Sequence, residues 1–257
     1  MNTIAQISIP RFIVIYTLLL IVLLIMKKCR LSQSRLLLIA SLRMTVQLIL
    51  AGYILTFIFQ NPNPLFTIGY ILAMVAFAIY RVLSQNKTVN NRFKLAIACS
   101  LSLSGLLVLI FFVSVVINED IFNPQYAIPL SGMIFGNAMT GINLGMKSFR
   151  EALESNRVTM TTLLDFGVKP DRILRPYVNQ SLETALLPTL NSMIGMGIVS
   201  LPGMMTGQIL SGTLPATAIL YQISIMIVIC TVVCLAVFGS LYFGYRTLYN
   251  NRNQFTF

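Results

Sequence analysis

The chain has 257 residues, of which 56% are apolar and only 10% are charged, and it contains no histidine. A soluble domain of this length would not tolerate so little charge on its surface. The net charge of +11 does not indicate a nucleic-acid partner, because the basic residues flank apolar stretches instead of forming one patch; the lipid bilayer is the expected environment.

Seven apolar stretches are long enough to cross a membrane as helices, which takes about 20 residues each. They predict an all-α, polytopic membrane helix bundle that forms a single transmembrane domain over residues 1–257. The predicted spans are Ile7–Met26, Leu36–Phe59, Leu65–Leu83, Leu95–Ile117, Ile128–Met146, about Leu186–Leu210, and Pro215–Phe243.

The basic residues predict how these spans are oriented. Lys27 and Lys28 follow the first apolar stretch, whereas a signal peptide carries its basic residues before that stretch. We therefore predict a retained first span with the N-terminus outside and the C-terminus inside. In this topology every Lys and Arg except Arg11 lies on the cytoplasmic side or on a helix rising from it, as the positive-inside rule requires. The outer loop with Glu119 and Asp120 carries neither Lys nor Arg.

The four cysteines fall near the cytoplasmic side or within predicted spans, so we expect no disulfide framework. Cys230 and Cys234 are four residues apart and share one face of a helix. They could bind a soft metal ion, or they could behave as small apolar residues in a packed interior.

One sizeable hydrophilic stretch, Lys147–Glu183, lies between the fifth and sixth predicted spans. It predicts a helix, a turn at Gly167–Pro170, and a second helix with Pro170 in its first turn. An apolar cluster precedes this turn, so the segment either lies on the membrane or docks a partner. The chain has no G-x-x-x-x-G-K-[ST] loop, so it does not bind ATP by that route.

The run Leu164–Pro170 resembles the cytoplasmic coupling loop of ABC-transporter permeases, in which a short helix and a glycine insert into a cleft of the ATPase. Two departures stand out: Thr161-Thr162-Leu163 replaces the acidic-Ala-Ala start, and a closing Leu-Pro is not at the expected spacing. By this resemblance the ATPase-coupling residues are Glu154, Leu163, Leu164, Asp165, Phe166, Gly167 and Lys169.

The fifth and sixth spans share a phrase. Leu130–Asn137 and Leu201–Gln208 both read L-x-G-M-x-x-G followed by an amide residue. In the predicted topology both phrases lie in the outer half of the bilayer. Each contains a G-x-x-x-G step, which lets helix backbones approach closely in lipid. The expected packing glycines are Gly132, Gly136, Gly203 and Gly207.

Amide and thioether side chains crowd the same two spans. Amides within a membrane need hydrogen-bond partners, so they either hold helices together or line a path for a polar solute. Methionines are soft metal ligands or adaptable fillers. The candidate substrate pathway consists of Met133, Asn137, Met139, Asn143, Asn191, Met204, Met205 and Gln208.

The spans lack groups that would couple transport to protons. No Asp or Glu lies in the middle of a predicted span, and Arg43 is the one charged residue placed deep within one. Arg43 either pairs locally, for example with Gln47, or extends toward the cytoplasm. An ion-coupled carrier or channel is therefore disfavoured, and the driving force is expected to come from a partner.

The runs Ile128–Met139 and Val199–Gly207 resemble signature segments of the FetB-type permeases, which include bacterial iron exporters and plant aluminium-tolerance permeases. The resemblance covers essentially the whole chain. It implies the membrane half of an ABC transporter in a bacterial inner or cytoplasmic (plasma) membrane, paired with a second copy of itself. A separate ATPase subunit would bind ATP and Mg, and this chain would carry no cofactor and no enzymatic activity.

The function expected from this resemblance is export of iron or a related metal ion. Plant members are associated with sugar-nucleotide movement, so permeation of a different polar solute is one alternative. A non-transporting membrane scaffold that docks an ATPase is another.

Overall fold

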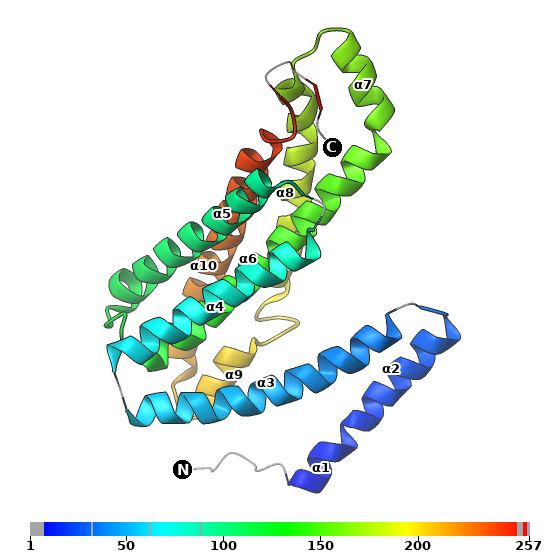
Figure 1. Ribbon diagram of the computed structural model, residues 1–257. Coiled ribbons are helices and arrows are strands. Elements are labelled where there is room, and N and C mark those ends of the chain that lie inside the picture. Colours follow the sequence, from blue (N-terminus) through cyan, green and yellow to red (C-terminus); the bar gives the residue numbers. More distant parts are fainter. Residues whose placement is uncertain (1–7, 32, 62, 88, 251–253, 256–257) are drawn as a thin grey trace. The chain divides into compact units, whose positions relative to one another are not determined.

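The computed structural model describes residues 8–31, 33–61, 63–87, 89–250 and 254–255, and almost all of them are helical (Figure 1). These residues include no strand, only two isolated bridges, which confirms the predicted all-α class. The chain divides into two compact units. Unit 1 comprises residues 1–61 and 210–212, and unit 2 comprises residues 62–209 and 213–257.

Unit 1 contains α1 (Ile9–Val14), α2 (Tyr16–Lys28) and α3 (Ser34–Gln60). The hydroxyl groups of Tyr16 and Thr45 share a hydrogen bond of 2.5 Å that joins α2 to α3. Most apolar side chains of these helices are exposed within the single chain, and Leu23 and Ile58 are the buried exceptions. Helices that are apolar on every side are typical of a lipid environment.

Unit 2 contains the remaining helices. They are α4 (Pro64–Gln85), α5 (Asn91–Phe111) with its π-helical extension η1 (Phe112–Ile117), α6 (Pro124–Ser155), α7 (Arg157–Asp165), α8 (Pro170–Gly195), α9 (Gly203–Leu210) and α10 (Pro215–Tyr245). Helix α10 packs against α5, α6 and α8, and α6 also packs against α4, so these two long helices form the centre of the bundle.

Five helical segments of the described residues are long and apolar enough to cross a membrane: Pro10–Lys28, Ser34–Gln60, Pro64–Gln85, Asn91–Ile117 and Pro215–Tyr245. Each overlaps one of the predicted spans. The other two predicted spans fall within α6 and across α8 and α9, which carry more polar residues. The number of seven spans and the orientation of the termini remain predictions.

The predicted sixth span is wrong as a single helix from Leu186 to Leu210. Helix α8 ends at Gly195, and the short α9 begins only at Gly203. Gly197 has φ +84°, a left-handed conformation that favours glycine and ends a right-handed helix. Pro202 then precedes α9 and lacks the N–H that would continue a helical ladder.

The boundaries of the hydrophilic stretch also differ from the expectation. Helix α6 continues to Ser155, so residues 147–155 extend the fifth predicted span instead of starting a separate element. Helix α8 begins at Pro170 and is 26 residues long. It therefore includes both the end of the hydrophilic stretch and the start of the predicted sixth span.

Close helix contacts in unit 2 depend on glycines. A Cβ built at Gly244 of α10 would lie 2.3 Å from Cε1 of Phe93 in α5, and one at Gly239 would lie 2.6 Å from Oγ of Ser100. Such distances are shorter than real contacts, so only glycine allows these backbones to approach. Phe93 and Tyr245 are each only 1% exposed in the resulting core.

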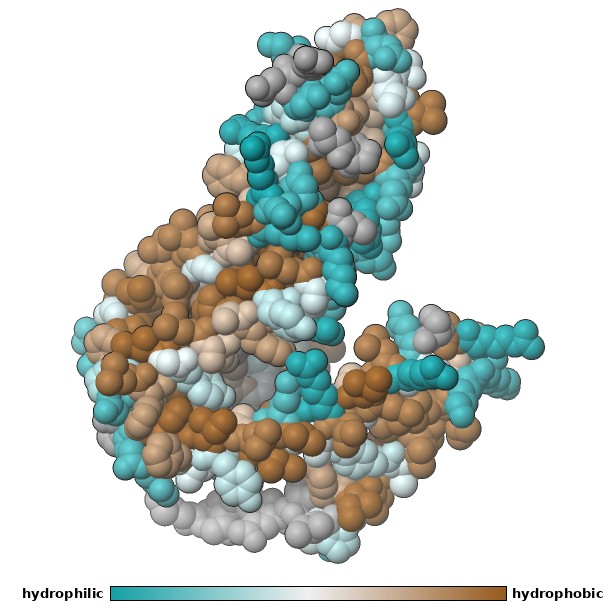
Figure 2. All heavy atoms as spheres, in the orientation of Figure 1, coloured by the Kyte–Doolittle hydropathy of each residue, from teal (hydrophilic) through white to brown (hydrophobic). Residues whose placement is uncertain are grey.

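Unit 2 has one strongly basic end. The start of α5 and the end of α10 are joined there, since Nδ2 of Asn90 donates to the carbonyl oxygen of Thr247 at 2.8 Å. Asn86, at the end of α4, lines a cavity together with Leu248 at the same end. The C-terminal end of α6 and all of α7 lie at the same end (Figure 1). Hydrophilic residues gather there in Figure 2, while hydrophobic residues cover the middle of the unit. At the opposite end, Oγ1 of Thr67 donates to the carbonyl of Phe122. The basic clusters of unit 2 therefore share one end.

Candidate functional site

A cavity of about 320 Å³ opens among α6, α8, α9 and α10. We call it the amide–methionine cavity. It is lined by Met133, Asn137, Thr140, Gly141, Leu144, Ala185, Pro188, Thr189, Ser192, Met196, Pro202, Gly203, Met204, Gln222, Ile225, Met226 and Ile229. Hydroxyl, amide and thioether groups therefore interrupt an otherwise apolar wall.

The cavity gathers three predicted pathway residues from two distant parts of the sequence. Met133 and Asn137 come from α6, and Met204 comes from α9. Nδ2 of Asn137 donates to the carbonyl oxygen of Met133 at 2.8 Å, which orients the amide along the helix. The two repeated phrases thus meet at one cavity, although the second phrase lies on its own short helix.

The other predicted pathway residues lie elsewhere. Oδ1 of Asn143 accepts a hydrogen bond of 3.2 Å from Nδ2 of Asn86, so Asn143 joins α6 to the end of α4. Met139 lines a separate cavity against α4, and Asn191 is exposed. Met205 is 8% exposed and lines a neighbouring cavity. Gln208 lies further along α9, and the residues that line the amide–methionine cavity do not include it.

Sequence reasoning missed Gln222, the most buried amide of the cavity at 6% exposed. Helix α10 is one of the most apolar helices of the chain, and Gln222 is the one amide within it. A lone amide in such a helix is the signal that could have identified it, because an intramembrane polar residue is a functional candidate by default.

The predicted packing glycines have a different setting from the one expected. A Cβ at Gly136, Gly203 or Gly207 would meet no heavy atom of the described residues within 4 Å, and one at Gly132 would meet only Cε of Met74, at 3.1 Å. The close helix contacts within one copy therefore occur at other glycines, such as Gly105, Gly239 and Gly244. Contact of the predicted glycines with a second copy remains a prediction.

The hydrophilic segment folds into an exposed apolar tip, formed by Val158, Leu163 and Phe166 on α7 and the turn that follows it. Phe166 is 81% exposed and Val158 is 79% exposed, whereas Met160 on the inner face of α7 is only 1% exposed. We call this surface the α7 tip. Apolar side chains gathered on an exposed surface at the hydrophilic end of a protein make that surface a candidate interaction site.

The turn that carries Phe166 is well defined, as the sequence predicted. Gly167 has φ +82°, and the N–H groups of Gly167 and Val168 donate to the carbonyl oxygens of Leu164 and Leu163 at 2.9 and 3.0 Å. This is the usual glycine-terminated end of an α-helix. Lys169 then precedes Pro170, the first residue of α8. The backbone thereby holds Phe166 outward.

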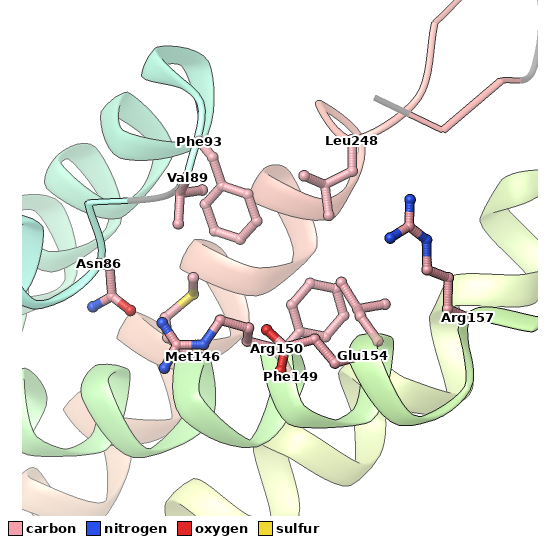
Figure 3. Close-up of a pocket in the computed structure, with 10 residues that line it drawn as sticks. Asn86, Val89, Phe93, Met146, Phe149, Arg150, Glu154, Arg157 and Leu248 are labelled. Atoms are coloured by element: carbon pink, nitrogen blue, oxygen red, sulfur yellow. The ribbon is translucent and has the colours of Figure 1, made fainter. Parts of the chain in front are cut away.

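A second cavity, of about 330 Å³, lies at the base of α7 (Figure 3). Its floor is apolar and includes Phe93, Phe149 and Leu248, while Arg150, Glu154 and Arg157 supply charge. In Figure 3 the guanidinium of Arg150 lies on the side of Asn86, and that of Arg157 on the side of Leu248. Glu154, a predicted coupling residue, therefore lies beside this cavity and not on the α7 tip.

No group of three or more His, Cys, Asp or Glu side chains that could hold a metal ion occurs within the described residues. The four cysteines form no disulfide with one another, and Cys230 and Cys234 are half-buried. The polar side-chain atoms that line the amide–methionine cavity are neutral oxygen, nitrogen and sulfur atoms.

Comparison with known proteins decides the family. Residues 9–249 match the family described as "Uncharacterised protein family (UPF0014)". The chain belongs to the UPF0014 family. A UPF0014 membrane protein of Synechocystis is 34% identical over 216 residues, covering 82% of each chain. No solved structure matches this UPF0014 chain significantly.

Two further relatives carry functional names. The probable iron export permease protein FetB of Escherichia coli is 30% identical over 212 residues, which is 82% of this chain and 81% of that protein. Protein ALUMINUM SENSITIVE 3 of Arabidopsis thaliana is 34% identical over 184 residues, which is 72% of this chain and 66% of that protein. The expected resemblance is confirmed: this UPF0014 chain is a multi-pass membrane protein similar to permeases.

Proposed function

We propose that the chain is the membrane permease subunit of an ABC transporter and exports iron or a related metal ion across the plasma membrane. A separate ATPase subunit, which binds ATP and Mg, supplies the energy, and two copies of the chain form the membrane part. One observation carries the proposal: helix α8 connects the α7 tip directly to the amide–methionine cavity.

Helix α8 runs from the α7 tip to the wall of the amide–methionine cavity. Helix α8 begins at Pro170, beside the turn that holds Phe166, and its other half contributes Ala185, Pro188 and Ser192 to the cavity wall. Over 26 residues such a helix spans about 39 Å, enough to cross the hydrocarbon core. Motion of an ATPase bound at the tip would therefore reach the cavity through one continuous helix, which can bend at Pro176 and Pro188.

Helices α6, α8 and α10 pack closely on one another. A Cβ built at Gly145 of α6 would lie 3.0 Å from Cγ1 of Val237 in α10 and 3.4 Å from Cβ of Ala185 in α8. The break between α8 and α9 then supplies a place where α9 can shift relative to these three packed helices, since irregular backbone within a membrane lines cavities in many transporters.

The substrate class follows from the chemistry of the cavity and from the relatives. Amide oxygens and thioethers bind metal ions without a fixed negative charge, so binding is weak enough for release. The name of the Escherichia coli relative points to iron. The lack of a proton-coupling carboxylate within the predicted spans favours a driving force from the partner.

Reconstituted vesicles test the proposal. The chain and the ATPase encoded beside it are inserted together, and release or uptake of ⁵⁵Fe is followed with ATP and with a non-hydrolysable analogue. The proposal expects ATP-dependent movement of iron or another metal ion. Movement of sugar nucleotides but not metals would replace the substrate, and ATPase binding without any transport would establish a scaffold instead.

A further inference from the structure

The neighbouring cavity that Met205 lines has a volume of about 480 Å³ and adjoins the amide–methionine cavity. Three side chains line both cavities: Met196, Gln222 and Met226. Met196 lies directly after the end of α8, where the helix is broken, and the other two belong to α10. These three side chains therefore form the wall between the two cavities.

Gln222 is an unusual component of this wall. Its side chain is 6% exposed, and its Nε2 contacts Sδ of Met196 at 3.6 Å. Its Oε1 is buried and has no hydrogen-bond partner among the described residues. A buried acceptor without a partner destabilises a protein, and such an atom in a native structure needs an explanation, for instance an ion that binds there.

Sulfur atoms are concentrated around this amide. Met226 follows Gln222 by four residues on α10, so their side chains lie on one helix face. Met133 and Met204 line the amide–methionine cavity on one side of the wall. Met193 and Met205 line the neighbouring cavity on the other side. Thioethers therefore flank the Gln222 oxygen on both sides of the wall.

These donors select a class of cation. The described residues that line the two cavities include no Asp, Glu, His or Cys. The cost of transferring an ion into a low-dielectric interior rises steeply with its charge, so neutral ligands favour a monovalent ion over a divalent one. Thioethers are soft ligands that select Cu(I) among the biological metals.

We propose that Met196, Gln222 and Met226 form a binding site for a soft monovalent cation of the Cu(I) class, in the wall between the two cavities. The inference narrows the "related metal ion" of the proposed function to a soft monovalent cation in place of divalent iron, and it rests on that function for the role in transport. Cation binding itself requires no ATPase, which separates the two tests.

The first experiment measures Ag⁺, a redox-stable substitute for Cu(I), by isothermal titration to the purified full-length chain in detergent. Cys29, Cys99, Cys230 and Cys234 are replaced by alanine so that thiols do not compete. We expect one saturable equivalent, weakened about tenfold or more by either Met196→Leu or Met226→Leu, which conserve volume but remove sulfur. Met74→Leu, outside both cavities, is the matched control and should leave the affinity of this equivalent unchanged.

The amide is tested separately. Gln222→Glu should add affinity for Mn²⁺, because a carboxylate favours a harder, divalent ion. X-ray absorption of the Cu(I)-loaded chain should show sulfur together with one oxygen or nitrogen neighbour, and Gln222→Leu should remove the lighter neighbour. Size-exclusion profiles establish that each variant is folded.

Unchanged Ag⁺ affinity in both leucine variants would overturn the site, as would equal affinity of the cysteine-free chain, without further substitution, for Mn²⁺ and Ag⁺. A chain that binds Ag⁺ as expected but transports no metal with the ATPase would refute the proposed function and leave the binding site standing. Metal transport with unchanged Ag⁺ affinity in the leucine variants would refute the binding site and leave the proposed function standing.

Discussion

The hydroxyl of Tyr245, at the end of α10, donates a hydrogen bond of 2.5 Å to Oδ1 of Asp171 in the first turn of α8. Tyr245 is 1% exposed, so this bond is formed at the edge of the core. Asp171 also lies where the dipole of α8 favours a negative charge. The bond therefore fixes the start of the helix that links the α7 tip to the amide–methionine cavity.

Replacing Tyr245 by Phe should lower the free energy of unfolding of the detergent-solubilised chain by about 1.5–3 kcal/mol, the usual value for a hydrogen bond to a charged group. Thermal unfolding followed by circular dichroism measures the change. Tyr80→Phe, at a position that is 67% exposed, is the control and should have little effect. Equal stability of the two variants would mean that the Tyr245 bond is not formed in solution.

Phe166→Ala should weaken association with the ATPase. Burial of a large apolar side chain contributes about 1.5–3 kcal/mol, which corresponds to roughly a 10- to 150-fold change in affinity. Co-purification and stimulation of ATP hydrolysis measure the loss, and membrane insertion should be unaffected. Phe77→Ala, a phenylalanine 44% exposed on α4, is the control. Normal stimulation by the Phe166 variant would remove the α7 tip from the ATPase interface.

Asn137→Leu should reduce the rate of transport, since it removes an amide from the wall of the amide–methionine cavity, while ATPase association should stay normal. Asn191→Leu is a suitable control because Asn191 is exposed like Asn137 but the described lining of the cavity does not include it. Gln208→Leu is the second pathway variant predicted from the sequence. If the Asn137 and Gln208 variants both transport normally, these amides only hold helices together.

Gly244→Ala should destabilise the bundle by about 1–3 kcal/mol, because the added methyl group would overlap the ring of Phe93. Gly207→Ala, where the structure leaves open space, should be neutral or slightly stabilising through higher helix propensity. The chemical denaturation midpoints of the two variants provide the comparison. A midpoint for Gly244→Ala equal to that of the unsubstituted chain would contradict the close contact of α5 and α10.

The membrane orientation can be tested by single-cysteine labelling in a background without the native cysteines. A membrane-impermeant maleimide should label a cysteine at Glu119 from outside intact cells. Cysteines at Lys87 and Lys169 should react only after the membrane is opened, since both belong to basic clusters. Labelling of either lysine position in intact cells would reverse the orientation.

The sequence by itself determined the helical class, the membrane environment and the turn at Gly167. These properties depend on local features: runs of apolar residues, the placement of Lys and Arg, and a Gly followed closely by Pro. The turn before α8 matches its prediction because the left-handed residue and the proline act within a few residues of one another. For the same reason, the exposed position of Phe166 was predictable as part of a docking element.

Only the tertiary structure decided which polar residues meet. Asn137 and Met204 line one cavity while Asn143 bonds to Asn86, although Asn137 and Asn143 lie on the same helix only six residues apart. The partner of a side chain depends on which neighbouring helix covers its face, and this choice involves contacts far apart in sequence. Gln222 became a candidate ligand only once α10 was placed beside the break after α8, because burial without a hydrogen-bond partner is a property of the packed chain and not of the residue.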